Sequence, residues 1–94
     1  MLIQHQHTPS KGVFFIPGED EDFLAELTYI RHGEDSIIIE HTEVAEELKG
    51  QNVGYQLVQA AVEYARSHNL KIVPVCTFAK SVIDKKPEFR DILA

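Results

Sequence analysis

Residues 48–57 read LKGQNVGYQL, a short glycine-containing segment with one lysine that leads directly into a helical pattern. The N-terminus of a helix carries unpaired backbone N–H groups and the positive end of the helix dipole. Glycine lets a ligand come close to such a backbone. The segment therefore predicts an anion site suited to the phosphates of a nucleotide-type cofactor.

The residues on both sides of this segment indicate an α/β or α+β fold. Downstream, apolar residues recur at helical spacing over 54–68, and Asn69 is a plausible end because asparagine tolerates the left-handed conformation. Strands are expected over 36–44 and 70–75, on either side of this helix. A strand, a helix and a second strand in this order form a parallel crossover.

Three further runs indicate an antiparallel meander, which makes the predicted sheet a mixed one. They span residues 2–7, 13–16 and 23–31, and in the last of them Phe23, Ala25, Leu27 and Tyr29 alternate on one face. A short helix over 78–84 and a helical turn over 88–93 are expected to follow. The predicted core contains the apolar stripe of the long helix together with Phe14, Phe15, Phe23 and Leu27.

Composition limits the classes of partner. The chain has 94 residues, as expected for a single domain over 1–94, with a net charge of −6 and one cysteine. Binding of nucleic acid or of an anionic membrane needs a surplus of Lys and Arg, so neither is expected. A lone cysteine and the absence of a signal-peptide pattern predict a reducing, cytoplasmic compartment. The acidic run 19–22 is expected to be a solvated turn.

At this point the sequence resembles a known family. Residues 49–54, KGQNVG, are similar to the acetyl-coenzyme A signature of the GNAT acetyltransferases, Arg/Gln-x-x-Gly-x-Gly/Ala. Residues 41–44, HTEV, and 74–76, PVC, resemble motifs of a subgroup of very short GNAT-like proteins, so the likeness extends over roughly residues 12–90. Asn52 departs from the usual glycine but tolerates positive φ, and Lys49 keeps a charge without the forked geometry of arginine.

The resemblance implies a domain that binds acetyl-coenzyme A and moves its acetyl group to an amine or thiol acceptor. Loop amides would hold the pyrophosphate, and the backbone of Val44 would bind the pantetheine arm or the acetyl carbonyl. The implied cofactor residues are Val44, Lys49, Gly50, Gln51, Asn52, Val53, Gly54 and Tyr55. Lys80, Lys85 and Lys86 either reach the 3′-phosphate or form a solvated face.

Cys76 is the implied chemical group. It would end the second crossover strand, beside the end of the 36–44 strand and near the thioester. The family's usual tyrosine is absent, since Phe78 stands near its place, so Cys76 would protonate the leaving thiolate or accept the acetyl group; otherwise it is a small buried residue. His41 is expected to activate Cys76.

Three acidic or imidazole groups are candidates to take a proton from an amine acceptor. His41 and Glu43, two residues apart, are expected to share one face of their strand, with Glu40 on the other face. His5 and His7 have the spacing of two metal ligands, but no third ligand accompanies them and no metal is expected.

The acceptor and the oligomeric state stay open. Ordinary GNAT members are roughly half again as long, and the parts absent here usually shape the acceptor pocket. The resemblance therefore implies an open acceptor site, suited to a macromolecule or completed by a partner chain. The alternatives are a non-catalytic module that binds coenzyme A or acyl-coenzyme A, and an interaction domain that has lost the ligand.

Overall fold

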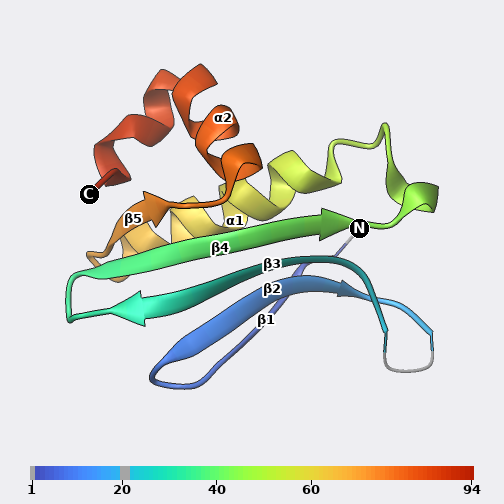
Figure 1. Ribbon diagram of the computed structural model, residues 1–94, viewed down its shortest axis with the longest axis horizontal. Coiled ribbons are helices and arrows are strands. Elements are labelled where there is room, and N and C mark those ends of the chain that lie inside the picture. The colour runs from blue at the N-terminus through green and yellow to red at the C-terminus, as the bar shows by residue number, and fades with distance from the viewer. Residues whose placement is uncertain (1, 20–21) are drawn as a thin grey trace.

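The computed structural model describes residues 2–19 and 22–94, which form five strands, two α-helices and two short 3-10 helices (Figure 1). Part of the acidic run 19–22 lies outside the described residues. The elements in chain order are β1 (Gln4–His7), β2 (Lys11–Pro17), β3 (Phe23–His32), β4 (Ser36–Val44), η1 (Glu46–Leu48), α1 (Val53–Ser67), β5 (Lys71–Pro74), α2 (Thr77–Lys85) and η2 (Pro87–Ile92).

The strands form one mixed sheet in the order β1-β2-β3-β4-β5. Strands β1 to β4 pair antiparallel with one another, and β5 returns parallel to β4 after the α1 crossover, which confirms the predicted fold. The pairing of β4 with β5 ends at Ile39 and Pro74. Because β4 continues to Val44, its last five residues extend beyond the end of β5.

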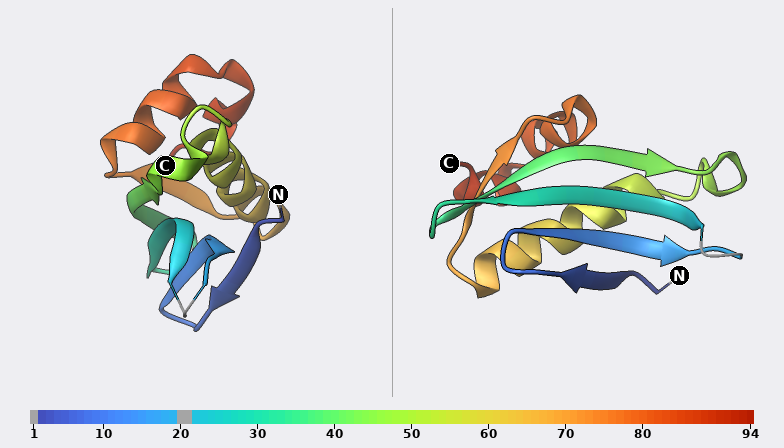
Figure 2. Two further views of the ribbon diagram at one scale, coloured as in Figure 1. Left: turned by 90° about the vertical axis from the view of Figure 1, so that its right-hand side faces the viewer. Right: turned by 60° about the horizontal axis from the view of Figure 1, so that its bottom comes forward.

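Helix α1 packs across one face of the sheet and contacts β2, β3, β4 and β5 (Figure 2). Asn69 is left-handed, with a φ of 55°, as its sequence position predicts. The N–H groups of Asn69 and Leu70 donate to the carbonyls of Arg66 and Ala65, the bond pair that closes many helices. The predicted apolar stripe is buried, with no exposed surface, at Leu57, Val58, Ala61, Val62 and Ala65.

Helix α2 lies beside α1 and contacts β4 and β5 as well. Its buried residues Ala79 and Ile83 join the same core as the α1 stripe. The two helices therefore share one core with the sheet. None of the helices in the described residues is long and apolar enough to cross a membrane.

The expectation that Phe23 joins the core is wrong. Ile16 pairs with Ala25 but Pro17 pairs with Phe23, so Leu24 is an extra residue in β3 at this bulge. An extra residue reverses the alternation of side chains. Phe23 consequently lies on the face away from α1, where its ring packs against Phe15 and stays 43% exposed.

Candidate functional site

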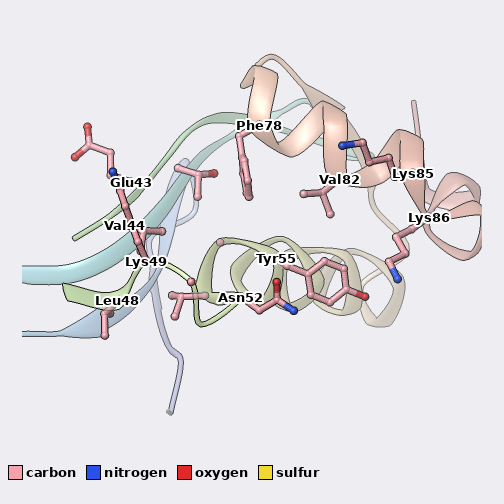
Figure 3. Close-up of a pocket in the computed structure, with 14 residues that line it drawn as sticks. Glu43, Val44, Leu48, Lys49, Asn52, Tyr55, Phe78, Val82, Lys85 and Lys86 are labelled. Atoms are coloured by element: carbon pink, nitrogen blue, oxygen red, sulfur yellow. The ribbon is translucent and has the colours of Figure 1, made fainter. Parts of the chain in front are cut away.

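A groove of about 860 Å³ opens where β4 extends past β5 (Figure 3). Its volume is within the range of small-molecule sites, about 300–1,000 Å³. The end of β4, the loop before α1, the first turn of α1 and one side of α2 form its walls. The lining residues are Thr42, Glu43, Val44, Leu48, Lys49, Gly50, Asn52, Val53, Gly54, Tyr55, Phe78, Val82, Lys85 and Lys86.

The groove contains every predicted cofactor residue except Gln51. Among the described residues, the Gln51 side chain instead donates to the carbonyl of Glu47, at 3.5 Å, away from the lining set. Sequence reasoning missed Thr42, Leu48 and Val82 as site residues. The four-residue spacing from Phe78 to Val82 could have indicated Val82, since residues four apart share one face of a helix.

The loop presents its backbone to the groove because two residues have positive φ. Gly50 has a φ of 85° and Asn52 a φ of 62°, so Asn52 adopts the conformation that glycine would favour at this place. The carbonyl of Asn52 accepts from the N–H of Gln56 at 3.0 Å. The N–H groups of the three residues before Gln56 lie in the first turn of α1, where no helical carbonyl can reach them.

Gly54 brings the two helices close together at the groove. A Cβ atom at Gly54 would lie 2.7 Å from Cζ of Phe78 and 2.9 Å from Cε2. The absence of a side chain therefore lets the Phe78 ring rest on the first turn of α1. Phe78 is 43% exposed and forms the α2 wall of the groove (Figure 3).

Cys76 caps the N-terminus of α2, rather than ending β5 as the sequence predicted. Its N–H donates to the carbonyl of Ile39, the last residue of β4 that pairs with β5, at 3.1 Å. Its thiol donates to Thr42 Oγ1 at 3.7 Å. The Cys76 thiol is thus held at the point where β4 and β5 separate.

His41 does not meet Cys76, so that prediction is wrong. His41 pairs with Thr28 on the sheet face opposite α1, and its Nε2 lies 4.0 Å from Oε1 of Glu26. Thr42, the next residue along the strand, faces α1 and contacts the thiol instead.

A bulge in β4 explains this difference. Tyr29 pairs with Ile39 but Thr28 pairs with His41, which leaves Glu40 as an extra residue. Glu40 and His41 consequently line the same hollow on the open face, and the prediction that they point to opposite faces is wrong.

Glu43 shares its face of β4 with His41, as the alternation predicts. It pairs with Glu26 across the sheet, and at the groove its side chain points away from Lys85 and Lys86 (Figure 3). Neither Glu43 nor His41 is therefore directed at the thiol of Cys76.

The lysines differ in their surroundings. Lys85 and Lys86 line the end of the groove that is farthest from β4 (Figure 3), and Lys86 Nζ lies 5.1 Å from the centre of the Tyr55 ring. Lys49 also lines the groove but pairs with Glu46 at 3.2 Å. Lys80 pairs with Asp84 at 3.0 Å and is not a lining residue.

These features together suit one type of ligand. The positive end of α1 and the lysines attract phosphate groups. On the side that β5 does not cover, the end of β4 offers backbone groups to an extended chain that runs alongside it. Cys76 is not a lining residue of the groove, but its thiol contacts Thr42, which is. The groove therefore fits a long ligand that carries phosphates at one end.

Comparisons with known proteins agree with this geometry. A profile of the GCN5-related N-acetyl-transferases matches residues 13–92. A GCN5-like protein from Staphylococcus aureus, solved by NMR, is 39% identical with a TM-score of 0.75, over 99% of this chain and 87% of that chain. No curated protein matches the chain significantly.

Larger enzymes share the fold. Nourseothricin acetyltransferase is 28% identical with a TM-score of 0.56, over 70% of this chain and 40% of that chain. An IAA acetyltransferase from Bacillus cereus has a TM-score of 0.60 at 16% identity, over 81% of this chain and 53% of that chain. The chain thus spans about half the length of these two proteins, and the second likeness concerns the fold alone.

Proposed function

Because this chain belongs to the GCN5-related N-acetyltransferase family, we propose that it binds acetyl-coenzyme A in the groove and transfers the acetyl group to an amine or thiol. One observation carries the proposal: the groove joins the free first-turn amides of α1 to the length of β4 that extends past β5. The first feature suits a pyrophosphate and the second suits a pantetheine arm.

The cofactor is proposed to lie with its pyrophosphate at the N-terminus of α1. The N–H groups of Val53, Gly54 and Tyr55 would donate to the phosphate oxygens, directly after the positive-φ residues Gly50 and Asn52. The pantetheine arm would follow β4 toward Val44. A backbone N–H of this strand edge would then polarise the thioester carbonyl.

The proposed reaction is a direct acyl transfer. The nitrogen of a neutral amine attacks the carbonyl carbon, a C–N bond forms and the C–S bond breaks. The attacking nitrogen gives its extra proton to solvent, and the departing thiolate gains a proton from an acid at the site. Cys76 has a place in this scheme as the proton donor, because its thiol sits beside Thr42 at the strand separation and Phe78 has no proton to give.

A second route gives Cys76 a covalent role. Its thiolate would attack the thioester, release coenzyme A and hold the acetyl group until the acceptor takes it. Intact mass after incubation with acetyl-coenzyme A separates the two routes. One added acetyl group in the wild type that is absent in Cys76→Ala supports the covalent route, and an unmodified wild type that turns over supports direct transfer.

Turnover tests the role of Cys76 in either route. Cys76→Ala is expected to bind acetyl-coenzyme A as the wild type does, while kcat falls by about 100-fold, as for the loss of a general acid. Calorimetry measures the affinity for acetyl-coenzyme A, and single-turnover assays with a panel of amines measure the rate of transfer. An unchanged kcat in Cys76→Ala would remove the thiol from the mechanism.

The second candidate function is a module that binds acyl-coenzyme A without catalysis. Phe78 favours it, since an apolar ring stands on the groove wall near the place that the family's proton-donating tyrosine would take. Binding with neither turnover nor acetylation across the amine panel would support this candidate. Failure of acetyl-coenzyme A to bind at all would contradict both candidates.

A further inference from the structure

The hollow on the sheet face opposite α1 is a second concave site, which the proposed cofactor does not use. It has a volume of about 710 Å³, within the range of small-molecule sites. In the described part of the chain, no helix covers β1 to β3 on this face (Figure 2). Glu40 and His41, at the bulge of β4, belong to its lining, and we call it the open-face hollow.

The open-face hollow meets the groove across β4. His41 lines the hollow, and the next residue, Thr42, lines the groove and contacts the Cys76 thiol. A smaller hollow of about 440 Å³ lies between the two, since it shares Glu43 with the groove and Glu26 with the open-face hollow. A ligand in the open-face hollow could therefore extend to the groove around the end of β4.

Carboxylates dominate the charge of these two hollows. Within residues 2–19 and 22–94, no Lys or Arg nitrogen lies within 4.0 Å of their carboxylates, and Lys11 is the one Lys or Arg among the lining residues. His41 Nε2 is 4.0 Å from Oε1 of Glu26. Carboxylates that line a concave surface attract cations. The acidic lining residues are Asp22, Glu26, Glu40 and Glu43.

Two features of this face are unfavourable without a cationic ligand. Glu26 of β3 pairs directly with Glu43 of β4, and like charges opposite each other destabilise a sheet. Thr28 lines the open-face hollow, and its Oγ1 is a buried atom with no hydrogen-bond partner in the described residues. A protonated amine would offset the repulsion and supply N–H donors.

We propose that the acyl acceptor is a small aliphatic diamine or polyamine and that the open-face hollow binds one of its protonated nitrogens. The inference rests on the proposed function and specifies its acceptor. A second, neutral nitrogen of the same molecule would reach the groove and attack the thioester, while the bound nitrogen keeps its proton. Phe23, 43% exposed at the hollow, offers an apolar surface to the methylene chain between them.

A matched pair of acceptors tests the charge requirement on the full chain. Putrescine carries two amino groups, and the corresponding amino alcohol has a hydroxyl in place of one of them. With acetyl-coenzyme A as the donor, kcat/KM is expected to be at least about tenfold higher for putrescine, since tenfold corresponds to one modest charged contact. Release of coenzyme A measures both rates.

The double variant Glu26→Gln, Glu40→Gln removes two carboxylates without changing the size of either side chain. The preference for putrescine should fall to about one, mainly through a higher KM for putrescine. Calorimetry with acetyl-coenzyme A checks that the variant still folds and binds the donor. Glu63→Gln is the matched control, because Glu63 is exposed on α1 and lines neither hollow, and it should keep the preference.

The outcomes separate the inference from the proposed function. Equal kcat/KM for putrescine and the amino alcohol, or a preference that survives in the double variant, would overturn the inference and leave the proposed function intact. Transfer to a lysine-rich peptide but not to putrescine would overturn the assignment to a small acceptor. Bound acetyl-coenzyme A without transfer to any of these acceptors would contradict the proposed transfer itself.

Discussion

The shape of the groove at the start of α1 depends on Asn52, which has an unusual backbone conformation, and on Gly54, which has an unusually close contact. Asn52 is left-handed, and Gly54 lies under the Phe78 ring. The sequence predicts the first property, because asparagine is among the residues that tolerate positive φ. The contact of Gly54 with a residue 24 positions later depends on tertiary packing, which no local pattern reports.

Substitutions at Asn52 test the conformation of the loop. Asn52→Gly is expected to keep the free energy of unfolding within a few tenths of a kcal/mol, because glycine adopts positive φ without strain. Asn52→Ala should lower it by about 1 kcal/mol, the cost of a left-handed alanine. Urea unfolding of both variants provides the measurement. An alanine variant as stable as the glycine variant would contradict the left-handed assignment.

Substitution of Gly54 should change the affinity for acetyl-coenzyme A without changing the stability of the fold. In Gly54→Ala, the new methyl group displaces the Phe78 ring, but alanine favours the helix by about 1 kcal/mol. The free energy of unfolding should therefore change little, while affinity for acetyl-coenzyme A falls because the groove wall moves. The control is Gly54→Ala with Phe78→Leu, whose smaller side chain restores the space. If the single variant binds as the wild type does, Phe78 does not shape the site.

At the scale of elements, the short strand β1 pairs with β2, and its His5 side chain adds contacts to β2, β3 and α1. Nε2 of His5 lies 2.6 Å from the hydroxyl of Tyr29, and the His5 ring stacks on Phe14 with centres 4.1 Å apart. Tyr64 of α1 meets the same ring edge-on. His5 is thus a packing residue here, and burial raises the pKa of Tyr29 above its ordinary range.

Acid should weaken this attachment. Burial, followed by the nearby His7 and His68, lowers the pKa of His5 below its ordinary value of 6.5. The unfolded chain therefore binds more protons as the pH falls below 6.5, and the folded state loses stability from there downward. The free energy of unfolding in urea should be smaller at about pH 5 than at pH 7.5.

His5→Phe is the variant that isolates this effect. It keeps the stacking on Phe14 but cannot be protonated, so the difference in stability between the two pH values should shrink. The hydroxyl of Tyr29 loses its partner, which should cost about 1 kcal/mol at both pH values. A pH difference as large in the variant as in the wild type would exclude His5 as its source.

The strand β4 shows why part of the site could not be predicted. Strict alternation identified the shared face of His41 and Glu43 correctly. It failed at Glu40, because a bulge depends on the pairing partner and adds one residue without a sequence signature. The sequence therefore pointed to His41 as the neighbour of Cys76, whereas the structure has Thr42, one residue later.

For the whole molecule, element type and order could be predicted because each signal is local and repeated. Three local patterns place the long helix consistently, and together they indicate a parallel crossover. They are the glycine-containing loop before the helix, its apolar stripe and its end at Asn69. Phe23 was misplaced for the same reason as Glu40, since its bulge at Leu24 is decided by pairing with β2. The contacts of Lys85 and Lys86 depend on how α2 lies against α1, which the sequence does not encode locally.

The core that joins sheet and helices should dominate stability. Leu57 has no exposed surface, and it packs in the core between α1 and the sheet. Leu57→Ala is expected to lower the free energy of unfolding by about 2–5 kcal/mol, the usual cost of a buried leucine cavity. Urea unfolding measures this loss. A loss below about 1 kcal/mol would show that this part of the interface is loosely packed.

The central claim is that acetyl-coenzyme A binds between the end of β4, the loop before α1 and α2. The most direct test is a titration of the isotope-labelled chain with acetyl-coenzyme A, followed by the NMR shifts of its backbone amides. The account predicts saturable shifts that are largest from Asn52 to Tyr55 and at Val44, with weaker ones at the end of α2. Shifts concentrated on β1 and β2, or no shifts at saturating ligand, would contradict it.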